Sequence, residues 1–166
     1  HNLSDKTAHN SFFNHSIVQL DASHLPFKNE TFDIVFSSWM LGTILDKNKQ
    51  SMILEEMKRI LKPQGKILLV ENDFASEFEI IRGRWPDQEH KTYQYNNWIL
   101  SQEFNIRNRL STYFKFESLE QAQFIFQSIW KNRLVKLPQS PVLTHNVIIF
   151  EYIKEIEKIN SNSFND

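Results

Sequence analysis

Cysteine is absent from the 166 residues of the chain. A chain without cysteine has no disulfide framework, no thiolate zinc site and no cysteine nucleophile. It is compatible with a reducing cytoplasm, which is the location that we predict. The formal net charge is also close to zero, at -1, so the composition offers no electrostatic footprint for nucleic acid or for an anionic membrane. We expect neither as a partner.

Glycine is scarce, with only Gly42, Gly65 and Gly83 in the chain, against a usual share of about 7%. No glycine-rich loop that could cradle a nucleotide can therefore be written anywhere in the sequence. Long apolar runs are missing as well, because none approaches the roughly 18 residues that a membrane-spanning helix needs. Residues 1–15 also lack the apolar middle of a signal peptide.

The hydrophobic residues that are present, 40% of the chain, suffice for the core of one compact domain. We predict a single domain over residues 1–158 and a disordered polar tail over 159–166. The polar and aromatic stretch 74–104 is a candidate lid or insertion. It contains a clear break at Arg82-Gly83-Arg84-Trp85-Pro86, followed by a predicted helix from about Tyr93 to Phe104.

Three short apolar runs in the first half of the chain predict strands. They are Ile17–Leu20, Asp33–Phe36 and Lys66–Val70, and the last two lack alternation, as expected of strands covered on both faces. Between the second and the third lies a predicted helix with Asp46 as its N-cap, which ends before Pro63. The order strand, strand, helix, strand predicts parallel pairing through crossovers.

The second half of the chain predicts two further strands around one helix. Residues 109–116 alternate in polarity, which is typical of a strand with one wetter face. Ser118 and Gln121 form a capping box at the start of the helix, and Val147–Ile153 is the last predicted strand. We expect the core to contain four phenylalanines: Phe114, Phe116, Phe124 and Phe126.

Polar and aromatic residues follow the three strands of the first half. They are Asp21-Ala22-Ser23, Ser37-Ser38-Trp39-Met40 and Glu71-Asn72-Asp73. In an open α/β sheet, ligands bind outside the carboxyl ends of the strands. A carboxylate beside exposed main-chain groups could accept a hydrogen bond from an adenine amino group. Trp39, Met40 and Leu25 could provide apolar contacts to the adenine ring. The alternative is that strand ends are polar because chains turn there.

Residues 17–73 resemble the middle of a class I S-adenosylmethionine-dependent methyltransferase of the UbiE/methyltransferase-11 type. The strongest parts of the resemblance are an Asp-Ala-x-x-Leu-Pro-Phe turn and a Leu-Lys-Pro-x-Gly-Lys hinge into a strand. The stretches that carry it are Val18-Gln19-Leu20-Asp21-Ala22, Leu25-Pro26-Phe27, Phe32-Asp33-Ile34-Val35-Phe36-Ser37-Ser38 and Arg59-Ile60-Leu61-Lys62-Pro63-Gln64-Gly65-Lys66-Ile67-Leu68-Leu69-Val70.

The resemblance implies an α/β fold: a Rossmann-like methyltransferase sheet, mostly parallel, with an antiparallel C-terminal strand pair and with the N-terminal strands missing. It implies that S-adenosylmethionine is the cofactor, that Asp21 receives its adenine amino group beside Ala22, and that Ser37, Ser38 and Trp39 lie near its methionine part. Transfer by in-line displacement at the activated methyl rests largely on positioning and desolvation, so no metal is expected.

The same resemblance places the glycine-rich loop and the acidic residue for the ribose hydroxyls before Ile17. We therefore expect a complementing N-terminal segment or a partner chain. The missing strand would lie between the strands at Ile17 and at Asp33, which leaves central hydrogen-bonding edges to be filled.

The methyl acceptor is expected to be a small molecule, although the sequence does not identify it. Candidate substrate residues are Met40, Trp85, His90 and Tyr93. His90 could move a substrate proton, and the alternative for it is a solvated loop. His9, His15 and His24 are expected to be surface residues, and Glu55, Glu56 and Arg59 the solvated face of a helix.

Three functions remain open. The first is methyl transfer to a small-molecule acceptor, with this chain supplying the adenine-side and substrate-side part of the site. The second is a non-catalytic, methyltransferase-like binding or scaffolding module, which the missing loop favours. The third is a nicotinamide-dependent oxidoreductase, which the Leu-Lys-Pro-x-Gly hinge and the antiparallel C-terminal pair fit poorly.

Overall fold

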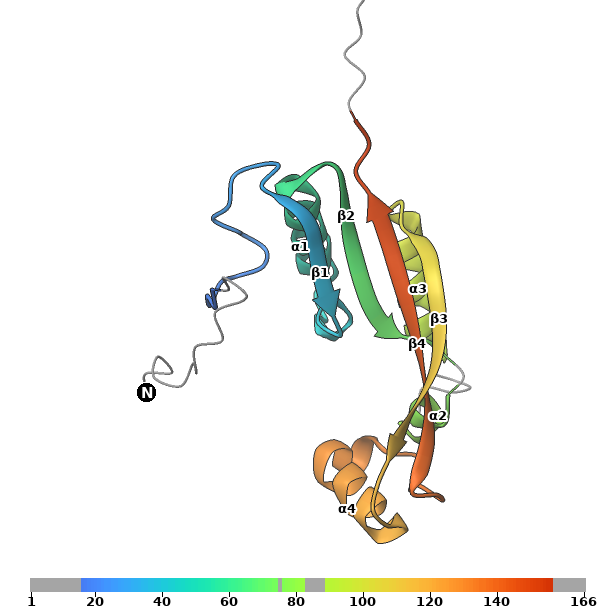
Figure 1. Ribbon diagram of the computed structural model, residues 1–166. Coiled ribbons are helices and arrows are strands. Elements are labelled where there is room, and N and C mark those ends of the chain that lie inside the picture. Colours follow the sequence, from blue (N-terminus) through green and yellow to red (C-terminus); the bar gives the residue numbers. More distant parts are fainter. Residues whose placement is uncertain (1–15, 75, 83–88, 157–166) are drawn as a thin grey trace, which may run out of the picture.

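The computed structural model describes residues 16–74, 76–82 and 89–156, apart from the side chains of residues 89 and 90. Four strands form one mixed sheet in the order β1-β2-β4-β3 (Figure 1). β1 and β2 are parallel, whereas β4 runs antiparallel to both β2 and β3. The predicted α/β fold with an antiparallel C-terminal strand pair is confirmed, although the described sheet contains only one parallel pair. The strands span Phe32–Ser38 (β1), Leu61–Asn72 (β2), Asn105–Lys115 (β3) and Val142–Ile153 (β4).

Two of the four helices begin at the caps that the sequence predicts. Asp46 accepts hydrogen bonds from the backbone N–H groups of Asn48 and Lys49 at the start of α1. Ser118 accepts one from Gln121 at the start of α4, and these side chains satisfy N–H groups that have no partner within the helix. The helices span Lys47–Ile60 (α1), Glu77–Ile81 (α2), Glu89–Ser101 (α3) and Leu119–Trp130 (α4), with short 3-10 helices at Leu41–Thr43 and Lys131–Arg133.

The main core lies between one face of the sheet and helices α1 and α3. Leu54 and Met57 of α1 and Ile99 of α3 pack there against the alternate residues Ile148 and Phe150 of β4. α3 falls within the candidate lid at 74–104, and its inner side belongs to this core. A lid function for the segment remains a prediction.

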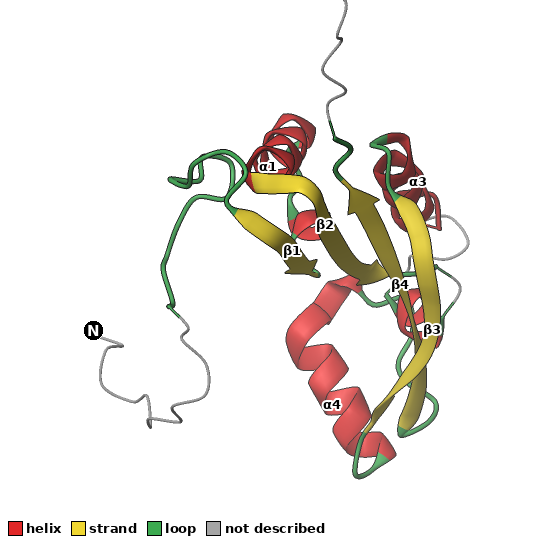
Figure 2. Ribbon diagram, turned by 45° about the horizontal axis from the view of Figure 1, so that its top comes forward, coloured by secondary structure: helices red, strands yellow, loops and turns green. Residues whose placement is uncertain are grey.

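A second, smaller core lies where β3 ends and β4 begins. It brings together Phe78 and Ile81 of α2, Phe126 of α4 and Leu143 of β4. Leu143 and Ile148 are an odd number of positions apart on one strand, so their side chains point to opposite faces of the sheet. α2 and α4 therefore cover the opposite face from α1 and α3, and only at one end (Figure 2).

The predicted strand at Ile17–Leu20 is wrong, because residues 16–20 form no strand and are exposed. An isolated extended segment gains no stability without a neighbouring strand to accept its hydrogen bonds, and none of the described strands pairs with it. One edge of β1 is likewise unpaired within the described sheet. Ile34 and Phe36 on this strand are 61% and 63% exposed, so the prediction that the run Asp33–Phe36 is covered on both faces is wrong for the described residues.

The expectation of a buried Phe124 is also wrong, because its side chain is 69% exposed while that of Phe126 is 1% exposed. Two residues that are two positions apart on a helix lie on opposite sides of it, at 3.6 residues per turn. Phe126 faces the sheet, so Phe124 faces away from it. None of the helices in the described part of the chain has the length and hydrophobicity needed to cross a membrane.

Candidate functional site

Three side chains meet where β1 and β2 end. Trp39 follows β1, Asn72 is the last residue of β2 and His145 lies near the start of β4. β4 runs antiparallel to β2, with Val147 opposite Asn72, so its amino end lies at the carboxyl edge of the parallel pair. This is the edge at which an open α/β sheet binds ligands.

Trp39 is fixed at this edge in an unusual backbone conformation. Its φ of 48° lies in the left-handed region, which costs a bulky residue free energy that the surroundings must offset. Its indole Nε1–H donates to Asn72 Oδ1 at 2.8 Å, and its ring stacks on the ring of His145 with the centroids 6.0 Å apart. The structure thus holds a half-exposed aromatic face at the position that the sequence assigns to the cofactor.

His145 was missed by the sequence analysis. Its Nε2 lies 2.9 Å from Asn72 Oδ1, the same oxygen that accepts from the indole of Trp39. Because that oxygen is an acceptor, Nε2 must carry a proton to make the hydrogen bond. Burial, together with the nearby charge of Arg82, lowers the pKa of His145, which favours the neutral ring at neutral pH. Only the reversed direction of β4 brings this residue to the site, and no local pattern in the sequence indicates it.

The Asp21 carboxylate lies at the start of a tight turn. Its Oδ1 accepts hydrogen bonds from the N–H and the Oγ–H of Ser23, at 3.0 and 2.8 Å, and these bonds lower the pKa of Asp21. Its Oδ2 lies 3.6 Å from Lys49 Nζ. Ala22 packs against the main core. An ionised carboxylate with one oxygen facing outward is therefore held by a turn that is anchored to the core.

Glu56 and Arg59 hold the next turn, at Leu25–Phe27, rather than lying on a solvated helix face. The Arg59 guanidinium donates to the carbonyl oxygens of Leu25 and Phe27, at 2.9 and 2.7 Å. Glu56 binds the same guanidinium and accepts from the N–H of Leu25 at 2.7 Å. These bonds, with Arg59 as the largest cause, lower the pKa of Glu56 to about 2. The predicted solvated face is wrong for these two residues, because the turn folds back onto α1, whereas Glu55 is exposed as predicted.

Replacing Arg59 with Lys is expected to loosen the Leu25–Phe27 turn while keeping the positive charge. An ammonium group cannot reproduce the planar set of donors that binds two carbonyls and a carboxylate together. We expect a loss of about 1 to 2 kcal/mol in the free energy of unfolding, and faster amide exchange at Leu25. Lys62→Arg, at an exposed pair with Asp33, is the control. Unchanged exchange at Leu25 in Arg59→Lys would contradict this role.

The predicted cofactor residues of β1 differ in burial. Ser37 is buried, and its Oγ has no hydrogen-bond partner among the described residues. Ser38 is half-buried. A buried hydroxyl without a partner costs free energy, so Ser37 has bonding capacity to offer a ligand. Met40 is partly buried and packs against the main core, so its side chain is turned toward the interior and not toward the edge where Trp39 lies.

The remaining predicted substrate residues are only partly described. Trp85 lies outside the described residues, and His90 is placed in α3 by its backbone alone. Tyr93 of α3 is half-exposed and its ring packs edge-on against Phe74, with the centroids 5.7 Å apart. Of these three residues only Tyr93 has a described side chain, and its ring contact is with Phe74.

Glu71 is a buried carboxyl one residue before Asn72. Tyr95 Oη–H donates to its Oε1 at 2.9 Å, and the N–H of Gly42 also donates to it. Burial raises the pKa of Glu71 to about 7, and the two hydrogen bonds only partly oppose that rise. A carboxyl that titrates near neutral pH beside a strand end is a property of many functional sites. The sequence showed the position of Glu71 but not its burial.

Residues 2–69 match the family described as a methyltransferase domain. Over 58 residues the chain is 45% identical to the ubiquinone/menaquinone biosynthesis C-methyltransferase UbiE of Haemophilus ducreyi, an alignment that covers 35% of this chain and 21% of that protein. It is 43% identical over 54 residues to the UbiE protein of Idiomarina loihiensis, covering 32% and 20%. The matched part spans about a fifth of the length of these curated relatives.

Solved structures resemble a larger part of the chain. Protein BH2331 of Bacillus halodurans C-125 matches with a TM-score of 0.51 and 18% identity, covering 83% of this chain and 71% of that one. A SAM-dependent methyltransferase of Methanosarcina mazei matches with a TM-score of 0.50 and 18% identity, covering 83% and 66%. At this level of identity, the similarity shows a shared fold.

Proposed function

Since residues 2–69 of this chain match a methyltransferase domain, we propose that the protein takes part in methyl transfer from S-adenosylmethionine to a small-molecule acceptor. In this proposal the chain supplies the adenine side of the site through Asp21 and Ala22. It supplies the methionine side and the substrate side through Ser37, Ser38 and Trp39.

The observation that carries the proposal is the construction of the edge after β1. Trp39 is held there against its backbone preference by Asn72 and His145, and the hydroxyl of Ser37 is buried without a partner among the described residues. Such strain and such unused bonding capacity recur at ligand sites. Both features fit a cofactor that supplies an activated methyl group and that the protein needs only to bind, orient and shield from water.

The outward oxygen of Asp21 fits the adenine amino group. Its partner oxygen is occupied by Ser23, so the carboxylate is oriented before a ligand arrives, and its lowered pKa keeps it ionised as an acceptor. The acceptor molecule then lies on the substrate side, for which Met40, Trp85, His90 and Tyr93 remain candidates. For Met40 this role rests on the resemblance, and for the other three it rests on their place in the candidate lid at 74–104.

A complementing polypeptide segment is the partner in this proposal. It would supply the glycine-rich loop and pair with the free edge of β1, where Ile34 and Phe36 are exposed in the described part of the chain. An unpaired edge strand with apolar side chains is a template for another strand. The segment belongs either to the same polypeptide or to a second one.

Calorimetric titration of S-adenosylmethionine tests the proposal. We expect Asp21→Asn to weaken binding by about tenfold, which corresponds to the loss of one charge-assisted hydrogen bond of roughly 1.4 kcal/mol. Asp33→Asn is the matched control, because Asp33 is an exposed aspartate at the amino end of β1, paired with Lys62. Equal weakening by both variants would contradict a specific role for Asp21.

The same titration separates the two remaining functions. It is repeated with an added polypeptide that carries a glycine-rich cofactor loop of the kind that the resemblance implies. Binding in the mixture, or in the chain by itself, supports a methyltransferase. If neither binds S-adenosylmethionine or S-adenosylhomocysteine, the alternative of a methyltransferase-like binding module is favoured.

A further inference from the structure

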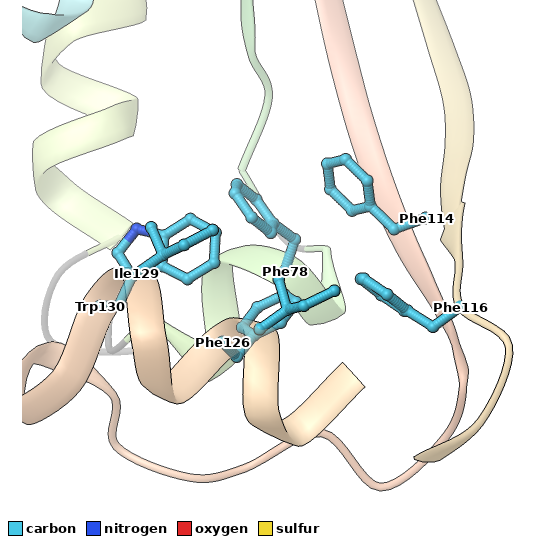
Figure 3. A pocket seen from close by; sticks show the side chains of 7 residues that line it. Phe78, Phe114, Phe116, Phe126, Ile129 and Trp130 are labelled. Carbon is cyan, nitrogen blue, oxygen red and sulfur yellow. The ribbon is translucent and has the colours of Figure 1, made fainter. Parts of the chain in front are cut away.

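An apolar cavity of about 150 Å³ lies between α4, α2 and β3 (Figure 3). Every residue that lines it is apolar, and most are aromatic. The main lining residues are Phe78, Phe114, Phe116, Phe126, Ile129 and Trp130.

The aromatic rings support one another around this cavity. The ring of Phe126 lies 4.7 Å from that of Trp130 and 6.0 Å from that of Phe116, and Phe78 lies 5.1 Å from Phe114. These centroid distances are typical of favourable aromatic pairs. Ile129 is 56% exposed, which places this residue at the mouth. The cavity is therefore shaped by well-packed rings and opens to solvent on the side of α4.

His145 separates the cavity from the edge where Trp39 lies. Its ring stacks on Phe114 at 4.8 Å and contacts Phe78 at 4.9 Å, and it stacks on Trp39 at 6.0 Å. A group in the cavity thus packs against the same two phenylalanines that pack against His145. The cavity and the candidate transfer site share one wall.

We propose that this cavity binds an uncharged apolar group of about the size of one six-membered ring. The identity of this group rests on the proposed function: it is the apolar part of the methyl acceptor. The reacting end of the acceptor then lies on the side of His145 that faces Trp39. Dry apolar cavities of about this volume accept benzene-sized ligands. A charged group would lose its hydration without a hydrogen-bonding partner in the lining.

The nearby cation Arg82 does not make the cavity a site for anions. Its guanidinium lies over the rings of Phe78 and Trp130, at 4.8 and 5.6 Å. It also forms an ion pair with the buried carboxylate of Glu79 at 3.1 Å. Because the pair is close to neutral overall, the cavity has no net positive charge to attract an anionic ligand.

Titration with toluene, followed by NMR and without S-adenosylmethionine, tests the inference. We expect saturable binding of toluene, a shift of the His145 ring signals, and no binding of benzoate, which carries a carboxylate on the same ring. Ile129→Trp should fill the mouth and weaken toluene binding at least tenfold. Phe124→Trp is the matched control, because Phe124 lies on the outer side of the same helix and does not line the cavity.

The variants distinguish a ligand-binding site from a cavity that binds no ligand. Should Ile129→Trp fail to fold, Ile129→Phe is a smaller change at the same exposed position. The inference is overturned if toluene does not bind, if benzoate binds equally well, if both tryptophan variants act alike, or if the His145 signals do not move. Toluene binding does not depend on the cofactor. If toluene binds, but neither the chain nor its mixture with the complementing polypeptide binds S-adenosylmethionine, the proposed function is contradicted and the apolar site stands.

Discussion

We expect the substitution Glu71→Gln to change the free energy of unfolding differently at different pH. The difference between variant and native protein should favour the variant by about 3 kcal/mol more at pH 8 than at pH 4.5. The native protein should lose this stability as the pH rises, and the variant should not. The measurement is the free energy of unfolding from urea titrations across this range, compared between the two proteins.

The sign follows from the direction of the shift. Burial raises the pKa of Glu71 from its ordinary value of 4.5 to about 7, so the folded state binds the proton more tightly than the unfolded state. The stabilising contribution is complete below about pH 4.5, falls between that value and about pH 7, and is lost above it. The amide of the substituted glutamine would resemble the protonated acid, with one oxygen for the N–H of Gly42 and an amino group for Tyr95 Oη.

Glu55→Gln is the control for this prediction, because Glu55 is exposed on α1. Its unfolding free energy should follow the native pH dependence. If Glu71→Gln also follows the native curve, the pKa of the Glu71 carboxyl is the same in the folded and unfolded states, and its burial does not raise it.

The sequence predicted those elements whose determinants are local. Asp46 and Ser118 each cap a helix through bonds to residues two or three positions away. Ile67 and Leu69 lie in the apolar run that predicted β2, and both side chains are buried on the same face of the sheet. Short-range bonds and apolar runs are visible in a sequence because they do not depend on the rest of the fold.

The features that the sequence did not predict depend on distant contacts. Ile17–Leu20 has the composition of a strand, but none of the described strands pairs with it. Arg59 has the spacing of a solvated helix residue, yet two of its partners, the carbonyl oxygens of Leu25 and Phe27, lie more than thirty positions earlier in the chain. His145 joins Trp39 only because β4 is reversed. In each case tertiary context, and not local preference, decides the outcome.

Replacing Phe126 with Ala is expected to lower the free energy of unfolding by about 3 to 5 kcal/mol. Phe126 is 1% exposed and contacts Phe78, Phe116 and Trp130. Its removal would merge the existing cavity with the space of a whole ring, and the surrounding aromatic side chains cannot close it without breaking their own contacts. Urea titration followed by circular dichroism measures the loss.

Phe124→Ala removes the same number of atoms from the same helix and should change the free energy of unfolding by no more than about 0.5 kcal/mol, because Phe124 is 69% exposed. Both variants change helix propensity in the same way. The difference between their losses in the free energy of unfolding therefore reports the effect of burial alone. Similar losses would mean that α4 does not pack against β3 and β4 in solution. Since Phe126 and Trp130 also line the apolar cavity, that result would remove the structural basis for ligand binding there as well.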